Sequence, residues 1–267
     1  MNILLSLTSF PIVICLLFTQ VEAFDLKPIL ADLEKDGVTI IPELFSPEEM
    51  DAIHDYYEPI KEKILHVLDT DKGHQRIFQT DGVTTYSHYW KIDQDFILQA
   101  GPGRFDTSYG FREGSFASDH LLHHPILEQI MQQTLHKEYT NYAGIINAMP
   151  ESGSQYWHRD THNLADSNND GSQLLTMDDF YFTVLIPLVP LSEENGTTEF
   201  RIGTHRKTAQ AFDEAENKRF NVALGSAIVF NGKISHRGRE NFSSHDRPVI
   251  YIVYHKKWYN DRYREGL

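Results

Sequence analysis

Apolar residues recur at helical spacing just after residue 23. The run FDLKPILADLEKDG predicts a short helix that stops at Gly37, with its apolar positions at Leu26, Ile29, Leu30 and Leu33. A short strand, VTIIPELF, follows it. A second helix is predicted over residues 46–68, because Ser46 suits the N-cap, Pro47 suits the first turn and Glu49 completes a capping box.

The pattern changes to strands in the second half of the chain. A third helix opening at Pro125 precedes the change, and residues 70–118, which are polar, aromatic and interrupted by glycine, are expected to form loops with short strands. From Asn141 onward, runs rich in Val, Ile, Tyr and Phe are separated by turn residues: YAGIINAMP, QYWHRD, FYFTVLIPLV, TEFRIG, GSAIVFNG and RPVIYIVYHKKWY. Several short strands at this spacing predict an antiparallel sandwich or barrel, within a single domain over residues 24–267.

The first 23 residues are expected to be a secretory signal. Ile3 to Phe18 is almost wholly apolar, and Val21 and Ala23 are small residues placed as at a signal-peptidase site. The apolar run is short for a membrane span, which favours a cleaved signal. It lacks the basic residues that usually begin a signal peptide, so a retained membrane anchor is the alternative. The prediction places the mature protein in the secretory pathway, secreted or in an endomembrane lumen, without stable membrane association.

Cysteine use and charge restrict the chemistry further. The only cysteine, Cys15, lies in the predicted leader, so the mature chain has no disulfide and no cysteine metal site. The formal charge is −14, of which Glu22 in the leader contributes one, leaving −13. Nucleic acid is disfavoured as a partner, because it binds net basic surfaces.

Candidate metal ligands stand out in QYWHRDTHN. On a strand, His158 and Asp160 project from one face, and a third ligand must come from elsewhere. His236, in FNGKISHRGREN, is the best candidate, because two imidazoles and one carboxylate on one side of a metal form the facial triad of non-haem Fe(II) oxygenases. His162 is a rival third ligand, and the cluster His120, His123 and His124 is a rival metal site. A further alternative is that His158 is an ordinary buried histidine that binds no metal.

Arg247 is the candidate anion-binding residue. It opens the alternating run RPVIYIVYH and is expected to share a face with Val249 and Tyr251. A buried guanidinium needs an anion and matches a carboxylate in two parallel hydrogen bonds. A dicarboxylic keto acid that chelates iron would supply that carboxylate. A structural ion pair or an exposed arginine is the alternative.

These motifs together resemble the phytanoyl-CoA dioxygenase family of Fe(II)/2-oxoglutarate-dependent oxygenases. The resemblance covers nearly the whole mature chain, in the order LEKDGVTIIPELFSPEEMDAI, SGSQYWHRD, NGTTEFRIGTHR, GSAIVFNGKISHRGREN and DRPVIYIVYH. It implies a double-stranded β-helix, a jelly-roll barrel with helices packed outside. It assigns metal ligation to His158, Asp160 and His236, with His162 at the pocket mouth, and assigns the 2-oxoglutarate salt bridge to Arg247.

The chain departs from the family pattern at Gly238, where members can carry a hydroxyl that helps to bind 2-oxoglutarate. Thr183 and Gln155 are candidate replacements for that contact, and Arg104 is expected to reach the co-substrate, a substrate anion or a loop salt bridge. The family chemistry uses Fe(II), 2-oxoglutarate and O2 to oxidise a C–H bond, by hydroxylation, desaturation or cyclisation. With Asp160 present, halogenation is not expected.

The expected substrate is a small metabolite or natural-product intermediate. Three features count against an acyl-CoA substrate. They are the predicted secretory route, the lack of a peroxisomal signal at the C-terminus and the lack of a basic cluster suited to CoA phosphates. The aromatic stretch around Tyr86, Tyr89 and Trp90 is expected in the core or along the pocket. A secretory-pathway peptide hydroxylase and a non-catalytic jelly-roll binding protein are the alternatives. Asn195 and Asn241 stand in glycosylation sequons that overlap turn motifs.

Overall fold

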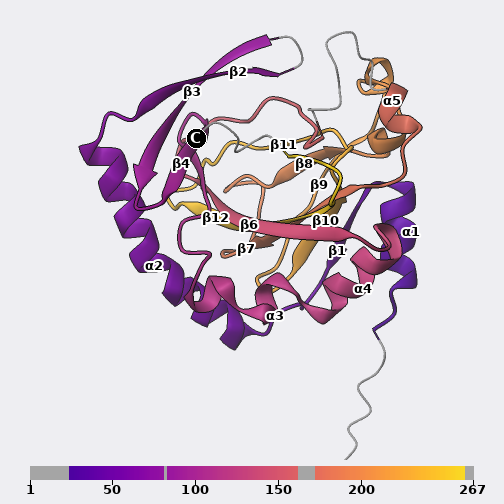
Figure 1. Cartoon of the computed structure of the whole chain (residues 1–267), viewed down its shortest axis with the longest axis horizontal. Helices are drawn as coiled ribbons and strands as arrows, with labels where there is room; N and C mark the ends of the chain where they lie inside the picture. The colour runs from indigo at the N-terminus through magenta and orange to yellow at the C-terminus, as the bar shows by residue number, and fades with distance from the viewer. Residues whose placement is uncertain (1–23, 81–82, 162–171, 262–267) are drawn as a thin grey trace, which may run out of the picture.

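A computed structural model describes residues 24–80, 83–161 and 172–261, so the predicted signal peptide and His162 lie outside the described residues (Figure 1). Strands dominate the second half of the chain, as expected. The elements are, in order, α1 (Lys27–Lys35), β1 (Val38–Ile41), α2 (Pro47–Thr70), β2 (His74–Thr80), β3 (Val83–Ile92), β4 (Asp95–Gly101), β5 (Arg104–Thr107), α3 (Asp119–Leu122), α4 (Pro125–Thr134), β6 (Tyr139–Ala148), α5 (Ser172–Leu175), β7 (Tyr181–Pro187), β8 (Thr198–Arg201), β9 (Asn217–Arg219), β10 (Ala227–Asn231), β11 (His236–Gly238) and β12 (Arg247–Lys256).

Two antiparallel sheets build the barrel. The large sheet has nine strands in the order β1-β10-β7-β12-β6-β5-β4-β3-β2, and the small sheet has three in the order β11-β8-β9. β12 lies near the middle of the large sheet, where it pairs with β6 along its whole length and with β7 over most of it. Its first eight residues are all buried, because one face contacts the helices and the other faces the barrel interior.

Helices cover the outer face of the large sheet, with α2 along one side, α3 and α4 below it and α1 at the other side (Figure 1). The start of α2 is fixed by the expected capping box: Ser46 Oγ accepts from the Glu49 amide, and the Ser46 amide donates to the Glu49 carboxylate. Below the cap, α2 buries Met50, Tyr57 and Ile64 against the sheet. Each fully buried side chain of this size stabilises the fold by roughly 1.5–3 kcal/mol.

A second core lies inside the barrel. It joins Phe200 of the small sheet to Phe230, Leu185 and Tyr251 of the large sheet. The metal-site segment is attached at the edge of this core, because His236 packs its ring 4.6 Å from that of Phe230 and 5.9 Å from that of Phe200. The core therefore holds one of the candidate ligands in place.

Residues 70–118 differ from the expectation of loops with short strands. β2 to β5 form a continuous antiparallel meander, and β3 alone is ten residues long. The stretch VTTYSHYWKI looked irregular because it is polar, yet Thr, Tyr and Val favour extended backbone irrespective of polarity. Trp90 was expected either in the core or along the pocket, and it is buried in the core. Its indole nitrogen donates to the Asp71 carbonyl.

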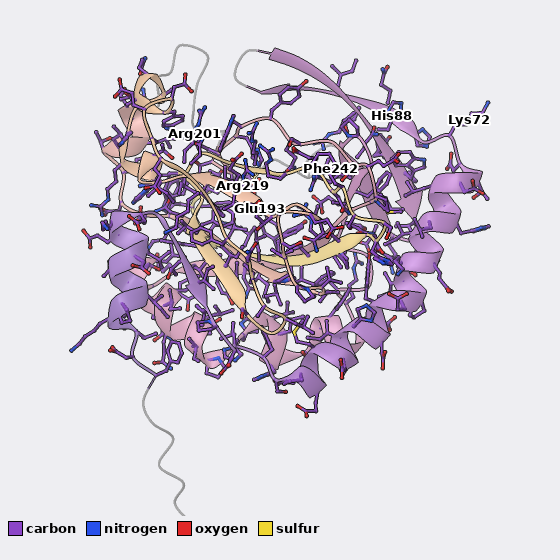
Figure 2. All side chains as sticks on the ribbon, turned by 180° about the vertical axis from the view of Figure 1, so that it is seen from behind. Lys72, His88, Glu193, Arg201, Arg219 and Phe242 are labelled. Carbon is purple, nitrogen blue, oxygen red and sulfur yellow. The ribbon has the colours of Figure 1, made fainter. Side chains whose placement is uncertain are left out.

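The outer side of the small sheet carries a cluster of arginines, two of which are labelled in Figure 2. Buried Glu199 accepts hydrogen bonds from Arg219, Arg237 and Arg239, while Arg201 pairs with Asp213. No basic cluster suited to CoA phosphates was predicted, and these arginines are scattered along the chain and meet only in the folded sheet. Carboxylates within the cluster offset much of its charge. Among the described residues, no helix is long and apolar enough to span a membrane.

Candidate metal and co-substrate site

The three candidate metal ligands come together at the rim of the small sheet. His158 and His236 form an isolated antiparallel bridge, with hydrogen bonds of 3.0 and 2.9 Å between their backbones, and the Asp160 amide donates to the Gly232 carbonyl. The stretch QYWHRD was expected to be a strand, and this was wrong. It is an extended loop that pairs with the chain around β11 at single points only, so His158 and Asp160 converge through those tertiary contacts.

The donor atoms of the triad fit one metal ion. Ligand atoms of His158, Asp160 and His236 all lie within 4.8 Å of one another. Asp160 Oδ1 is 3.4 Å from His236 Nε2 and 3.9 Å from His158 Nε2. Each imidazole uses Nδ1 toward the backbone carbonyl two residues earlier, at 2.9 Å for His158 and 3.1 Å for His236. This second contact leaves Nε2 as the metal-facing nitrogen, as is usual for histidine ligands.

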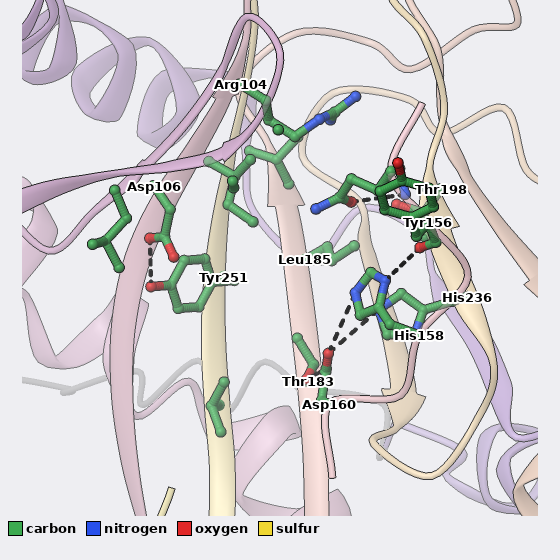
Figure 3. A pocket seen from close by; sticks show the side chains of 18 of the residues that line it. Arg104, Asp106, Tyr156, His158, Asp160, Thr183, Leu185, Thr198, His236 and Tyr251 are labelled. Atoms are coloured by element: carbon green, nitrogen blue, oxygen red, sulfur yellow. Dashed lines mark hydrogen bonds and ion pairs between the residues drawn. The ribbon is translucent and has the colours of Figure 1, made fainter. Parts of the chain in front are cut away.

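Thr183 on β7 contacts the triad directly. Its hydroxyl donates to Asp160 Oδ2 at 2.6 Å, while Oδ1 faces the two histidines (Figure 3). This hydrogen bond holds one carboxylate oxygen away from the imidazoles and favours one-oxygen ligation by Asp160. The residue was a candidate contact for 2-oxoglutarate, and the structure places its hydroxyl on a candidate metal ligand.

The metal-site loop is also held from outside. The guanidinium carbons of Arg201 and Arg237 lie 4.4 and 4.5 Å from the ring centre of Trp157, the residue before His158. Cation–π contacts of this kind contribute about 0.5–1 kcal/mol each when partly exposed. The arginine cluster on the small sheet therefore helps to fix the position of His158.

Two buried arginines occupy one side of the barrel interior. Arg247 on β12 and Arg104 on β5 both pair with Ala148 on β6, so the three side chains project from the same face, with the small alanine in the middle. Arg247 is 3% exposed and Arg104 only 1%. Arg247 was expected to share a face with Val249 and Tyr251, and all three line the same cavity.

These arginines lack carboxylate partners in the described part of the chain. Arg104 donates to the carbonyls of Gly153 and Arg239, and the Nε atoms of both arginines are buried without a partner. Burial and then the charge of Arg104 lower the pKa of Arg247 to about 9, and burial lowers the pKa of Arg104 to about 10. Both groups stay charged at neutral pH, so an anion is required to compensate them. The loop salt bridge that was one expected role of Arg104 is absent among these residues.

Gln155 and Gly238 lie beside Arg104. The Gly238 amide donates to Gln155 Oε1 at 2.9 Å. A β-carbon at Gly238 would meet Gln155 Oε1 at 2.7 Å and Arg104 Nη1 at 2.9 Å. The glycine that departs from the family pattern therefore makes room for the guanidinium of Arg104.

The triad and the arginines line one cavity of about 950 Å³. Further polar groups lie in its wall. Tyr251 donates to Asp106 at 2.8 Å within this wall (Figure 3), and Tyr142, Tyr181 and Asp261 form a second hydrogen-bonded group. The alternation after Arg247 predicted the place of Tyr251, but nothing local in the sequence marks the other residues, which were missed.

The rival metal ligands do not gather around a second site in the described residues. His120 pairs with Glu49, His123 pairs with Glu128, and His124 accepts from the Ile126 amide as the cap of α4. The one group of three metal-binding side chains found among those residues is the triad. His162 follows the described segment, so its place at the pocket mouth stays a prediction.

Both sequon asparagines use their side-chain amides within the fold. Asn195 Nδ2 donates to the Pro190 carbonyl, and its oxygen accepts from the Ser192 amide. Asn241 is fully buried and donates to the carbonyls of Ala148 and His245. A glycan on either nitrogen would break these contacts, which counts against modification of the folded chain, and sequon use stays a prediction.

The comparisons with known proteins identify the family. The family model described as phytanoyl-CoA dioxygenase (PhyH) matches residues 33–249. The chain therefore belongs to the PhyH family of Fe(II)/2-oxoglutarate-dependent dioxygenases, as its motifs predicted, and the expected enzyme class and cofactors are those of this family. Dioxygenase cdmD of Talaromyces verruculosus is 29% identical over 150 residues, a match that covers 53% of this chain and 48% of that protein. The match thus spans about half the length of this relative.

Solved structures confirm the fold. The alpha ketoglutarate dependent epimerase SnoN from nogalamycin biosynthesis superposes with a TM-score of 0.59 at 12% identity, covering 86% of this chain and 82% of SnoN. AviO1 from Streptomyces viridochromogenes Tue57 gives 0.60 at 16% identity, covering 88% and 96%. HygX from Streptomyces hygroscopicus, solved with nickel, 2-oxoglutarate and hygromycin B, gives 0.56 at 12% identity, covering 88% and 89%. The expected jelly-roll barrel is the architecture that these proteins share.

Proposed function

We propose that this protein is an Fe(II)- and 2-oxoglutarate-dependent dioxygenase that oxidises a C–H bond of a small metabolite or natural-product intermediate. One observation carries the proposal: a His-Asp-His triad and two buried arginines without carboxylate partners line the same cavity. Family membership supports it, and so do the small molecules named with SnoN and HygX, nogalamycin and hygromycin B.

Each residue has a role in this proposal. His158, Asp160 and His236 hold Fe(II) on one side, which leaves the opposite positions open, as in other facial-triad sites. When bound, the iron with 2-oxoglutarate and O2 supplies the oxidation, in which 2-oxoglutarate is converted to succinate and carbon dioxide. Arg247 binds the distal carboxylate of 2-oxoglutarate through its guanidinium fork.

Two further residues extend the co-substrate site. Arg104 projects beside Arg247 and supplies a second positive charge, while Gln155 limits the space next to it. Thr183 orients Asp160 through its hydrogen bond. The chain's contribution is therefore to bind and orient the reactants and to exclude water, because the cofactor carries the oxidation itself.

The cavity favours a small substrate over the alternatives. A volume of about 950 Å³ lies in the range of ligand pockets and exceeds what 2-oxoglutarate alone needs. A secretory-pathway peptide hydroxylase remains the second candidate, because the leader that motivates it lies outside the described residues. A non-catalytic binding protein would be expected to have lost a ligand, whereas all three are present.

Turnover of 2-oxoglutarate to succinate tests the proposal. Purified protein is expected to form succinate only with Fe(II) and O2, and His158→Ala or Asp160→Ala should abolish this and reduce bound iron. His162→Ala should leave most of the activity, because the described triad is complete without it. Equal loss in all three variants would show that the ligands are wrongly assigned.

A further inference from the structure

Two tyrosines and an aspartate form a hydrogen-bonded wall of the cavity, here called the tyrosine wall. It consists of Tyr142 on β6, Tyr181 on β7 and Asp261 in the segment after β12, and all three line the same cavity as the triad. Tyr181 donates to Asp261 Oδ2 at 2.8 Å, Tyr142 donates to the same oxygen, and the two phenol oxygens are 3.1 Å apart. None of these residues has a part in binding iron or 2-oxoglutarate in the proposed function.

The tyrosine wall lies at the opposite end of the strands from the arginines. Tyr142 and Arg247 are near opposite ends of the paired strands β6 and β12, since Tyr142 pairs with Val253 and Arg247 with Ala148. Tyr181 precedes Thr183 by two residues on β7, so both face the same side, and Thr183 contacts Asp160. Thr183 and Tyr142 both pair with Val253 of β12, so the Asp160 side of the triad lies next to the tyrosine wall and the arginines lie further along the cavity.

Hydrogen-bond chemistry restricts what this wall can bind. A phenol has one proton to donate, and the protons of Tyr142 and Tyr181 are used on Asp261 Oδ2 or on each other. What the wall offers a ligand is thus acceptor lone pairs, on the phenol oxygens and the carboxylate. Burial, followed by the charge of Asp261, raises the pKa of Tyr142 well above its usual value, so the phenols stay protonated and in this arrangement.

A further acidic group lies in the cavity wall between the tyrosine wall and the arginines. The Asp106 carboxylate accepts a hydrogen bond from Tyr251, so the phenol proton of Tyr251 is likewise already used. A ligand that matches these groups must bring hydrogen-bond donors, and a positively charged donor gains most because charge-assisted hydrogen bonds are the stronger ones. The mature chain's net charge of −13, from a total of −14 that includes Glu22, would also attract a cation.

We propose that the tyrosine wall is a substrate subsite that binds a protonated amine. The description of its ligand as the substrate rests on the proposed function, whereas the amine preference does not. In a substrate bound this way, the amine lies on Asp261 and the phenol oxygens, and the carbon skeleton extends toward the triad.

Direct binding of matched probes tests this subsite. Cyclohexylamine, cyclohexanol and cyclohexanecarboxylate share one ring and differ in the group they present. Their dissociation constants would be measured by saturation-transfer NMR at pH 7, with Zn(II) and 2-oxoglutarate present so that no turnover takes place. The wild-type protein is expected to prefer the amine over the alcohol by about tenfold, and over the carboxylate by more.

Variants then locate the preference. Asp261→Asn keeps the shape and removes the charge, so the amine and the alcohol should bind about equally. Glu193→Gln, at an exposed position labelled in Figure 2, is the matched control and should keep the wild-type preference. Tyr142→Phe removes one acceptor and should weaken amine binding with little effect on the alcohol, and thermal denaturation checks that each variant is folded.

Several results would overturn the subsite: no saturable binding of the amine, no preference for it in the wild type, or a preference that survives Asp261→Asn. Loss of 2-oxoglutarate binding in Asp261→Asn would also overturn the proposed subsite, because the tyrosine wall would then belong to the co-substrate site. Succinate formation is measured separately. If the wild type prefers the amine but never converts 2-oxoglutarate, the proposed function fails and the subsite stands.

Discussion

Adding one carbon at Gly238 should weaken 2-oxoglutarate binding without unfolding the protein. Gly238 does not have the left-handed conformation that requires glycine, so Gly238→Ala tests space alone. The new β-carbon would lie 2.9 Å from Arg104 Nη1 and 2.7 Å from Gln155 Oε1, whereas ordinary contact begins at 3.4 Å. Both neighbours are ends of flexible side chains, so they can move by roughly 0.5 Å or more with little effect on the free energy of unfolding.

In the proposed function Arg104 binds the co-substrate, so the cost of Gly238→Ala is expected in 2-oxoglutarate affinity. A hydrogen bond between charged groups contributes about 1.5–3 kcal/mol, and displacement of the guanidinium from hydrogen-bonding distance loses most of it. The dissociation constant for 2-oxoglutarate should therefore rise by about 10–100-fold. Isothermal titration calorimetry with Zn(II) in place of iron measures this constant, and thermal denaturation measures stability.

A second glycine provides the matched control. A β-carbon added at Gly153 would meet nothing within 4 Å, so Gly153→Ala should bind 2-oxoglutarate as the wild type does, although the Gly153 carbonyl also accepts from Arg104. In a double-mutant cycle with Arg104→Ala, Gly238→Ala should add little further loss, since both act through the same guanidinium. An unchanged constant for Gly238→Ala, or full additivity with Arg104→Ala, would refute the reasoning.

Three further predictions concern neighbouring groups and the leader. Arg247→Lys keeps the charge but loses the fork, so 2-oxoglutarate affinity should fall by on the order of 2–3 kcal/mol, and an unchanged Michaelis constant would show that another cation holds the co-substrate. Thr183→Val removes the donor to Asp160, so iron affinity should fall by about 10–100-fold; a loss of 2-oxoglutarate affinity at intact iron affinity would make Thr183 a co-substrate contact instead. Expression in a eukaryotic secretory system should give a chain that starts at Phe24, and N-terminal sequencing that finds Met1 would contradict the leader.

Local signals in the sequence predicted those features that local physics determines. The capping box at Ser46 set the start of α2 correctly, because its hydrogen bonds lie within four residues. The alternation after Arg247 placed that arginine inside the barrel, because successive residues of a strand point to opposite faces and every second one therefore faces the interior. These successes extend to the family, whose model matches residues 33–249.

Long-range pairing defeated the same reasoning. His158 and Asp160 alternate as in a strand, yet they are held by a bridge to His236 and a hydrogen bond to Gly232, across a separation that no sequence window spans. Thr183 was a candidate co-substrate contact, but the register of β7 brings its hydroxyl to Asp160. Asp261 follows the last strand without any motif, and only the closure of the barrel brings it to the tyrosines.

The distribution of charge in the cavity restricts how the reactants can be arranged. Arg104 and Arg247 require an anion, and 2-oxoglutarate supplies one at its distal carboxylate. The tyrosine wall offers acceptors and negative charge, which would repel that carboxylate and attract a donor. In the proposed function, a co-substrate bound in the reverse orientation would leave two buried cations uncompensated and place a carboxylate beside Asp261. The electrostatics proposed to bind 2-oxoglutarate therefore reserve the opposite end of the cavity for a substrate of complementary charge.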